Sequence, residues 1–278
     1  MRRDGRPLSE VLFIAFDTET TGLSPVVGRL VEVAAVRFTL DGRELAVFQQ
    51  LIDPRVAIPV EVQGVHGITD GMVRGQPTIE AVLPPFVDFL GDADTTLLAH
   101  NAPFDLGFLA MALARLRMEG PPHRLLDTLD LTRRLYPAWP SHALGRVAAH
   151  LRLPIGARHR ALADARLVKD VFLEILRHRP SIKTMADLAR LSPMLTFADA
   201  PVVPAVLPTG FEPLATALFE SRALTISYAL VGRGAEVRKI TPRLLLQANG
   251  LAYVIAHCHR DGFEKTFRLD RILRCWLD

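Results

Sequence analysis

Two carboxylates stand two positions apart at the end of an apolar stretch near the start of the chain. Asp17 and Glu19 follow residues 11–16, whose composition predicts a buried strand. Because side chains alternate along a strand, both carboxylates point to the same face, about 6–7 Å apart. Two like charges that leave a hydrophobic strand together are costly unless a cation lies between them. Oxygen-only ligands suit Mg²⁺ or Mn²⁺, so this strand is expected to form one wall of a metal site.

Two further acids and a histidine lie near predicted helix starts. Asp105 falls in the first turn of a helix expected over residues 103–117, and Asp164 falls near the start of one expected over residues 161–179. His159 precedes Asp164 by five residues. Taken alone, each acid could simply stabilise its helix through the macrodipole, and His159 could be a solvated loop residue. The alanines around Asp164 would let its helix approach the sheet closely and bring that carboxylate to the first strand.

Taken together, these positions match a known family in order and in local context. The stretch from about residue 11 to residue 176 resembles the DEDDh exonucleases, the group that contains the proofreading ε subunit of bacterial DNA polymerase III. The resembling segments are DTETTGL at 17–23, VHGITD at 65–70, AHNAPFD at 99–105 and HRALADA at 159–165. The resemblance implies a ribonuclease-H-like α/β fold with a mixed central sheet, and 3′→5′ hydrolysis of a nucleic-acid strand to nucleoside monophosphates.

The resemblance also implies a role for each residue of the site. Asp17 should bridge two divalent ions, Mg²⁺ or Mn²⁺, with Glu19 and Asp164 on the ion that holds the attacking water. Asp105 should help to hold the second ion. His159 is the expected general base, because an imidazole ordinarily titrates near neutral pH. Two ions about 3.5–4 Å apart can activate the water and stabilise the charge on the leaving 3′ oxygen.

Substrate contacts are expected beside the metal strand. Backbone N–H groups near Thr20 and Gly22 would face the terminal nucleotide, while Val65 and His66 resemble family positions near the 3′-terminal sugar and base. Phe104 would wedge beside the scissile bond or a base; alternatively, it is an aromatic residue of the first helical turn that packs in the core. Such a site has to hold an unpaired 3′ terminus, so single-stranded DNA is the expected substrate.

The elements that position these residues follow one another along the chain. Strands are expected over residues 29–40 and 43–52, after which helices and short buried strands alternate. Several prolines mark a linker before residue 211, and about five short strands bounded by glycine turns predict a small all-β barrel beyond it. The expected parts are an exonuclease domain over 8–180, a short helix and proline-rich linker over 181–211, and the barrel over 212–278.

The barrel carries a resemblance of its own. Residues 214–277 resemble a WYL domain, a small Sm/SH3-like barrel that binds nucleic acid or a regulatory ligand. The resembling segments are ISY at 226–228, ITPR at 240–243, NGLAYVIAHC at 249–258 and FRLDRI at 267–272. Of the triad that gives the family its name, only Tyr253 is kept. With Tyr253, the basic positions Arg243, Arg268 and Arg271 are expected to bind nucleic acid; alternatively, they are surface arginines on strand faces.

Length and composition set the remaining limits. The 278 residues suffice for about two domains, and 49% of them are hydrophobic. The longest apolar run near the start, residues 11–16, is far shorter than the ~20 residues that cross a bilayer, so a cytoplasmic protein without a membrane role is expected. The net charge of +3 falls within residues 212–278, which hold 10 basic and 7 acidic side chains. This mild basicity is compatible with a nucleic-acid partner.

The expected function is therefore a 3′→5′ exonuclease whose barrel captures or positions a DNA strand. A DNA polymerase or a repair protein is the partner class to consider. Two alternatives stay open. The chain could trim RNA, because the family also contains RNases with the same five residues, and contacts to the 2′-hydroxyl would decide between the two. The barrel could instead sense a ligand or a nucleic acid with the nuclease domain as its scaffold, although the complete set of catalytic residues argues against this.

Overall fold

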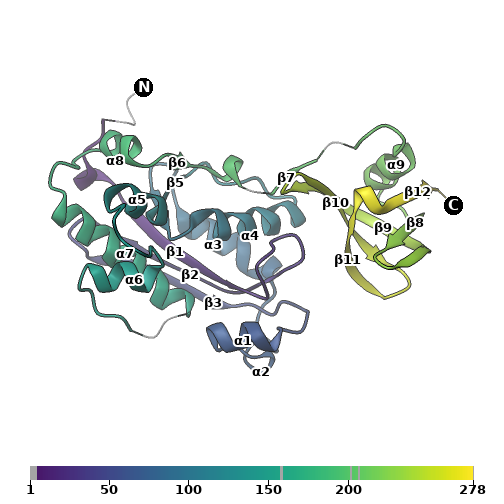
Figure 1. Ribbon diagram of the computed structural model, residues 1–278, viewed down its shortest axis with the longest axis horizontal. Coiled ribbons are helices and arrows are strands. Elements are labelled where there is room, and N and C mark those ends of the chain that lie inside the picture. The colour runs from purple at the N-terminus through teal and green to yellow at the C-terminus, as the bar shows by residue number, and fades with distance from the viewer. Residues whose placement is uncertain (1–4, 157–158, 201, 206, 278) are drawn as a thin grey trace. The chain divides into compact units, whose positions relative to one another are not determined.

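The computed structural model describes residues 5–156, 159–200, 202–205 and 207–277 (Figure 1). Contacts between residues divide the chain into two units. The first comprises residues 1–23, 28–112 and 119–200, and the second comprises residues 24–27, 113–118 and 201–278. The expected domain limits, 8–180 and 212–278, stay a prediction.

A six-stranded sheet forms the centre of the first unit, with its strands in the order β3-β2-β1-β4-β5-β6. The strands are β1 (Phe13–Thr20), β2 (Leu30–Phe38), β3 (Glu44–Leu51), β4 (Thr96–Ala99), β5 (Arg124–Asp127) and β6 (Met194–Leu195). β1 pairs antiparallel with β2 and parallel with β4. The mixed central sheet expected from the sequence is thus confirmed, and the strand that carries Asp17 and Glu19 lies where its antiparallel and parallel parts meet.

Helices surround this sheet. They are α1 (Val60–His66), α2 (Asp70–Val73), α3 (Ile79–Leu90), α4 (Ala102–Arg115), α5 (Thr128–Leu135), α6 (Leu144–His150), α7 (Ala161–His178) and α8 (Met185–Leu191). α7 packs directly on β1 and β2, because its buried face begins with small residues, Ala161 and Ala165. Further along, Phe172 packs against Phe13 with ring centroids 5.1 Å apart. Full burial of one such side chain contributes about 1.5–3 kcal/mol, so these contacts fix α7 across β1.

The second unit carries an antiparallel sheet in the order β11-β10-β9-β8-β12, with β7 also paired to β9. Its elements are β7 (Val202–Pro204), α9 (Glu212–Glu220), β8 (Leu224–Leu230), β9 (Arg233–Ala248), β10 (Leu251–Cys258), β11 (Phe263–Arg268) and β12 (Ile272–Trp276). The core contains Leu214, Ile226, Val254 and Phe267. The expected all-β fold is confirmed; among the strands that the structure describes, the hydrogen-bonded path ends at β11 and β12 without closing.

Two segments differ from the sequence-based expectation. The proline-rich stretch is more than a linker, because β6 pairs with β5 and β7 pairs with β9, so each sheet gains a strand. Helices α1 and α2, which hold positions 65 and 66, were not anticipated because they are short and interrupted by glycines. None of the helices in the described ranges is both long and apolar enough to cross a membrane.

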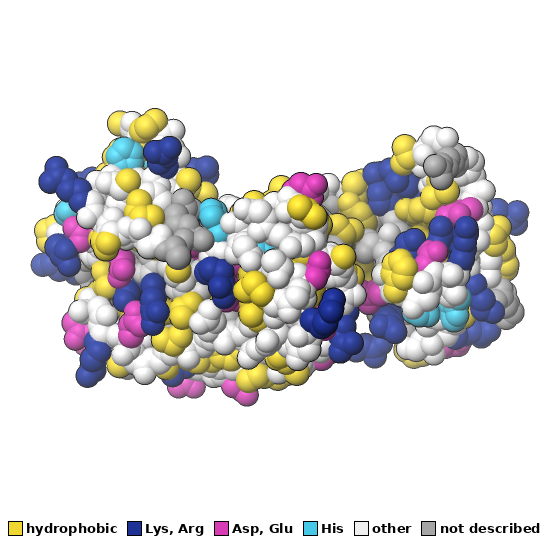
Figure 2. Space-filling model, turned by 90° about the horizontal axis from the view of Figure 1, so that it is seen from below, with side chains coloured by type: hydrophobic (Ala, Val, Ile, Leu, Met, Phe, Trp, Pro, Cys, Tyr) yellow, Lys and Arg dark blue, Asp and Glu magenta, His cyan; other side chains and the backbone are white. Residues whose placement is uncertain are grey.

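Charged side chains are mixed on the face drawn in Figure 2. Described Lys and Arg side chains occur over both units, among acidic and hydrophobic ones, and do not join into one continuous basic band there. This agrees with the small net charge of +3. Attraction of a polyanion to this face would therefore depend on a few local cations rather than on a broad positive field.

Candidate active site

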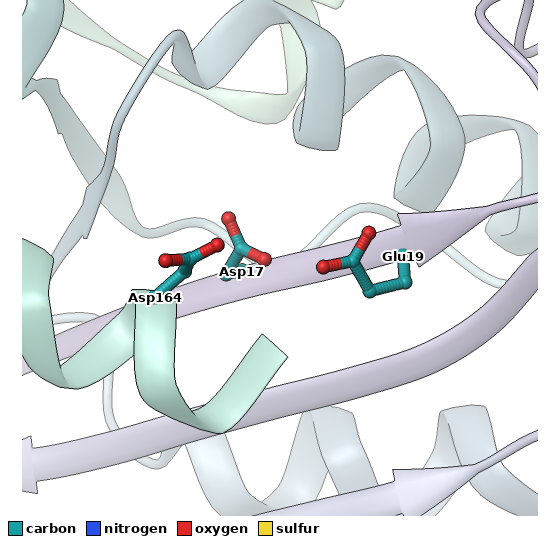
Figure 3. Close-up of side chains that lie close together, drawn as sticks. All are labelled: Asp17, Glu19 and Asp164. Carbon is teal, nitrogen blue, oxygen red and sulfur yellow. The ribbon is translucent and has the colours of Figure 1, made fainter. Parts of the chain in front are cut away.

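Three carboxylates from two elements gather on the sheet of the first unit. Asp17 and Glu19 leave the same face of β1, and Asp164 comes from the first turn of α7, which packs on that strand (Figure 3). One oxygen from each of the three carboxylates lies within 4.8 Å of the others. Asp164 is buried, while Asp17 and Glu19 are half-buried. Three hard oxygen donors at this spacing are suited to an ion such as Mg²⁺ or Mn²⁺.

Electrostatics at this cluster favours a bound cation. Burial raises the pKa of Asp17 well above its usual range, and the charges of Asp105, Glu19 and Asp164 raise it further. Burial, followed by the charges of Asp164 and Glu32, raises the pKa of Glu19 to about 8. Like charges this close oppose ionisation of one another, and a divalent cation between them removes that cost. The donor set therefore fits a divalent metal ion.

Asp105 lies next to this cluster but is not one of the three carboxylates within the 4.8 Å limit. It is buried at the start of α4, where its Oδ1 accepts hydrogen bonds from the Thr18 backbone N–H at 2.9 Å and from the Thr18 hydroxyl at 2.7 Å. Burial raises the pKa of Asp105 to about 7 despite these hydrogen bonds. Its charge in turn raises the pKa of Asp17, so the two carboxylates act on one another.

His159 stands just before α7 and is tied to the cluster through its backbone. Its φ of 59° is left-handed, and its N–H donates to Asp164 Oδ2 at 2.9 Å. A non-glycine residue in this conformation is uncommon and is held here by that hydrogen bond. The chain thus fixes the residue expected to be the base relative to the Asp164 carboxylate in the first turn of α7.

The residues expected to contact substrate are spread around the end of β1. Thr20 is buried and its hydroxyl donates to the Gly22 carbonyl at 2.7 Å. Val65 on α1 is 57% exposed, so it presents an apolar surface to solvent. Phe104, in the first turn of α4, is half-buried and its ring lies 5.0 Å from that of Phe108.

His66 is placed differently from its neighbour Val65. It is only 4% exposed, and its Nδ1 accepts the Ile68 N–H at 3.0 Å. Its Nε2 therefore carries the proton and donates to the Thr20 carbonyl at 3.3 Å. Burial lowers the pKa of His66, which keeps this ring neutral. His66 thus connects the turn after α1 to the end of β1 through these two hydrogen bonds.

In the second unit, the structure brings together two of the four expected nucleic-acid contacts. Tyr253 on β10 is directly opposite Arg268 on β11, so their side chains share one face of the sheet. Arg268 also forms an ion pair with Asp270 at 2.6 Å. Arg243 on β9 is exposed and lies 3.8 Å from Glu264, and Arg271 lies in a single 3₁₀ turn.

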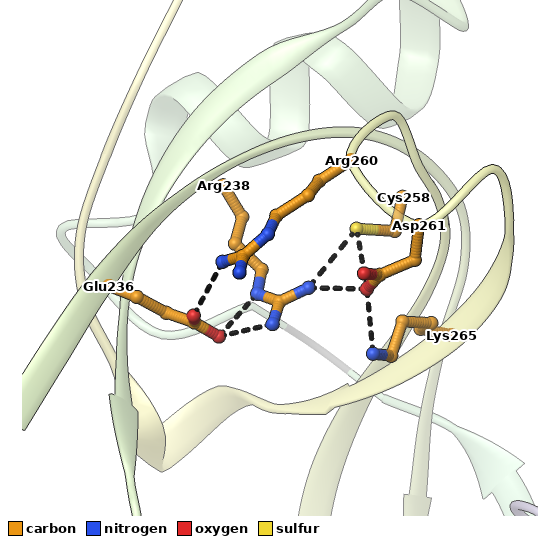
Figure 4. A network of polar contacts seen from close by, with 6 residues as sticks. All are labelled: Glu236, Arg238, Cys258, Arg260, Asp261 and Lys265. Atoms are coloured by element: carbon orange, nitrogen blue, oxygen red, sulfur yellow. Dashed lines mark hydrogen bonds and ion pairs between the residues drawn. The ribbon is translucent and has the colours of Figure 1, made fainter. Parts of the chain in front are cut away.

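Three other cations of this unit belong to a network of ion pairs within the unit. It consists of two acids, three bases and one thiol, namely Glu236, Asp261, Arg238, Arg260, Lys265 and Cys258 (Figure 4). Arg238 lies between the two acids, and the Cys258 thiol donates to Asp261 at 3.3 Å. All three cations are paired with the two acids, so this network contributes mainly to the structure of the unit.

Two further residues at the site were not found from the sequence. Glu32 on β2 is fully buried opposite Glu19, and Asp127 ends β5, where its Oδ1 accepts the N–H groups of Asn101 and Leu129 at 2.9 Å. Glu32 had one signal that could have revealed it, because it is a lone acid inside an apolar strand. Asp127 had a signal only for its cap on α5, because Asp is a preferred residue before a helix. Its contact with Asn101, on a different loop, had none.

Comparison with known families agrees with this division of the chain. A family model described as Exonuclease matches residues 14–172, which include the three clustered carboxylates, Asp105 and His159. A second model, described as WYL domain, matches residues 210–275. The first match covers more than half of the chain.

Known proteins match different shares of this chain. DNA polymerase III PolC-type from Halalkalibacterium halodurans is 38% identical over 172 residues, which is 59% of this chain but only 12% of that protein. A structure of Exonuclease X in complex with 5′ overhanging duplex DNA is 29% identical, with a TM-score of 0.50, and covers 63% of this chain and 98% of that chain. Exonuclease I from E. coli in complex with a dT13 oligonucleotide shares the fold at 16% identity, with a TM-score of 0.57, covering 88% of this chain and 55% of that chain.

Proposed function

Because the chain belongs to the Exonuclease family, whose members are divalent-metal-dependent nucleases, we propose that it hydrolyses DNA from the 3′ end and releases nucleoside monophosphates. One observation carries this proposal: oxygens of Asp17, Glu19 and Asp164 come within 4.8 Å of one another, although Asp164 lies far from the other two in sequence. An apolar strand and a helix start rarely place three acids together without a cation to neutralise them.

Two divalent ions, Mg²⁺ or Mn²⁺, are proposed for this site. Asp17, Glu19 and Asp164 would hold one of them, and Asp17 with Asp105 would hold the other. The bound ions would supply Lewis-acid stabilisation of the charge that develops on the phosphate and on the leaving 3′ oxygen. The raised pKa values of Asp17, Glu19 and Asp105 support this assignment, because each carboxylate gains from a neighbouring cation.

His159 is the proposed general base. Its imidazole would take a proton from the attacking water as the water oxygen bonds to phosphorus and the bond to the 3′ oxygen breaks. The hydrogen bond from its backbone N–H to Asp164 supports this role, since it couples the position of the base to that of a metal-binding carboxylate.

A single-stranded 3′ end of DNA is the proposed substrate. The exposed Val65, the half-buried Phe104 and the backbone near Thr20 and Gly22 would receive the terminal nucleotide. The names of two similar proteins support DNA, since one is a DNA polymerase and the other is a nuclease in complex with duplex DNA. The WYL domain beside the Exonuclease match favours a nuclease that acts in DNA repair or end trimming, alone or beside a polymerase.

The polarity of digestion tests this proposal. A single-stranded DNA oligonucleotide with a label on its 3′-terminal nucleotide should release that label at once as a mononucleotide, in the presence of Mg²⁺ or Mn²⁺. The same oligonucleotide labelled at its 5′ end should give a ladder of shortening products. Asp17→Ala should slow release by about 10³-fold or more, while Glu80→Ala, at an exposed acid on α3, should leave it unchanged. Early release of the 5′ label would overturn the polarity, and faster digestion of a matched RNA would overturn the choice of DNA.

A further inference from the structure

Glu32 is a fully buried charge within the apolar strand β2. Its two oxygens accept four hydrogen bonds: from Arg160 Nε at 3.1 Å and Nη2 at 3.0 Å, from the Ala161 backbone at 3.0 Å and from Gln49 at 2.8 Å. Burial alone would raise the pKa of Glu32, but the hydrogen bonds from Arg160, Gln49 and Ala161 outweigh it and lower the pKa. A buried carboxylate costs several kcal/mol unless it is paired in this way, so Glu32 is held ionised for a structural purpose.

The place of Glu32 in the sheet puts it beside the metal-binding carboxylates. It is directly opposite Glu19 in the antiparallel pair of β1 and β2, so both side chains point to the same face of the sheet. Both oxygens of Glu32 are already used by protein donors. Glu32 therefore serves as an anchor beside the site, in contrast to Glu19, whose carboxylate joins the cluster.

What Glu32 anchors is the first turn of α7. This helix begins at Ala161, and the residue before it, Arg160, makes no capping hydrogen bond with its own side chain. Glu32 supplies the missing acceptor for the Ala161 N–H and places a negative charge at the positive end of the helix. Meanwhile His159 is fastened to Asp164 by the hydrogen bond at 2.9 Å.

We propose that Glu32 is a positioning residue: its clamp on Arg160 and Ala161 sets the start of α7, and with it the base and the helix-borne carboxylate, against β1. This inference rests on the proposed nuclease function for its kinetic consequences. A shift of about 1 Å in such a group can cost about 10²-fold in rate, so the clamp should matter more to turnover than to substrate binding.

The chain offers a matched control for this clamp. Glu44 on β3 also holds α7 to the sheet, through Lys169 at 2.7 Å and Arg166 at 3.1 Å. These contacts lie one to two turns further along the helix. Glu44 thus makes ion pairs with the same helix at a more exposed position, without touching the segment that carries His159.

The experiment compares Glu32→Gln with Glu44→Gln in the full-length chain. Thermal unfolding, calorimetric titration with Mn²⁺, and the kcat and KM for 3′-end hydrolysis are measured for both, below their melting temperatures. We expect Glu32→Gln to lower kcat and Mn²⁺ affinity by about 10- to 100-fold with little change in KM. Glu44→Gln should lower the melting temperature while it keeps kcat and Mn²⁺ affinity within about twofold of wild type.

Two results would overturn the inference. The first is a folded Glu32→Gln protein that retains wild-type kcat and Mn²⁺ affinity. The second is a Glu44→Gln protein that loses both to the same degree as Glu32→Gln. If Glu32→Gln does not fold, Arg160→Lys is the alternative, because it keeps the charge but removes the bidentate contact with Glu32. Wild-type kcat and Mn²⁺ affinity in Arg160→Lys would likewise refute the positioning role of Glu32. Wild-type protein that binds Mn²⁺ but degrades no nucleic acid would refute the proposed function instead, and the Mn²⁺ titration would still test the clamp.

Discussion

Asp17, Glu19 and Asp164 share a small, partly buried space, where burial first and repulsion between the carboxylates second raise the pKa values of Asp17 and Glu19. Without a cation, the Glu19 carboxyl of the folded chain has a pKa of about 8 and keeps its proton at pH values below this. The unfolded chain releases that proton at the ordinary pKa of glutamate, 4.5. Between these values the folded state binds more protons than the unfolded state, so its stability falls as the pH rises.

This sign leads to a prediction about pH and metal. In EDTA, the melting temperature should fall as the pH is raised from 6 to above the Glu19 pKa of about 8. Addition of Mg²⁺ or Mn²⁺ should raise the melting temperature, and should do so more at the higher pH, because metal binding requires ionised carboxylates. Differential scanning fluorimetry at matched ionic strength provides the measurement. A metal-induced gain that is larger at the lower pH would contradict this description of the cluster.

Removal of one charge gives the complementary prediction. Asp17→Asn should raise the melting temperature in EDTA by several degrees, since about 1 kcal/mol corresponds to about 2–4 °C in a chain of this size. The same substitution should abolish the gain on addition of metal. Glu80→Gln, at an exposed acid, should change neither value. A stabilisation by metal that survives in Asp17→Asn would show that the ion binds elsewhere.

The residues of the site differ in how far their roles were predictable. Asp17 and Glu19 were predictable because two acids on one face of an apolar strand are unfavourable without a partner. Asp105, His159 and Asp164 were predictable because they lie in recognisable local segments. The pair of Glu32 and Arg160 left no such signal, because 128 residues separate its members. Only the register of β1 with β2, together with the docking of α7, makes that pair visible.

At the scale of elements, the site depends on how closely α7 approaches β1. Ala161 and Ala165 are completely buried in this contact. Ala163, on the same helix, is only half-buried. Small side chains on the buried face keep the helix close enough for Asp164 to join the two carboxylates of the strand.

Enlarging that face should move the helix. Ala165→Val should destabilise the protein by about 1–3 kcal/mol through overpacking, and should lower nuclease activity because Asp164 and His159 shift with the helix. Ala163→Val carries the same loss of helix propensity but should be tolerated. Urea unfolding and the rate of 3′-label release measure the two effects. Equal losses for the two variants would contradict the close-approach argument.

The elements themselves were predictable where composition and turn signals agree. The strands with long apolar runs, such as β1, β2 and β10, follow from the sequence, as does the alternation of strands and helices. β6 and β7 do not, because two or three residues acquire strand geometry only by pairing with β5 and β9. Helices α1 and α2 likewise depend on packing of Ile58, Ile68 and Val73 rather than on a periodic pattern.

At the scale of the whole molecule, the chain combines a nuclease-family unit with a WYL-domain unit. The three cations of the ion-pair network, Arg238, Arg260 and Lys265, are all paired, so contacts of the second unit with nucleic acid are expected at other positions. We propose Tyr253 and Arg268 as such a position, because they share one face of the sheet and an aromatic ring with a guanidinium can hold a base and a phosphate together. Arg268 would exchange its ion pair with Asp270 for the phosphate.

This leads to a prediction about strand capture. In the full-length chain, Arg268→Ala should weaken binding of single-stranded DNA and reduce the slope of log Kd against log salt by about 1. The rate at saturating DNA should stay near that of wild type, because the substitution lies outside the carboxylate site. Arg274→Ala, at an exposed arginine of β12, serves as the control and should leave the slope unchanged. Equal slopes for wild type and Arg268→Ala would remove this position from the binding surface.

The most direct test of the central claim is to locate the ions. Crystals grown with Mn²⁺ and a short single-stranded DNA should show anomalous scattering between Asp17, Glu19 and Asp164, at about 2.0–2.3 Å from their oxygens, with a second peak near Asp105 and Asp17. Asp17→Asn crystals prepared in the same way should lose these peaks. If active wild-type protein binds Mn²⁺ with no anomalous peak against these carboxylates, the account of the site is wrong.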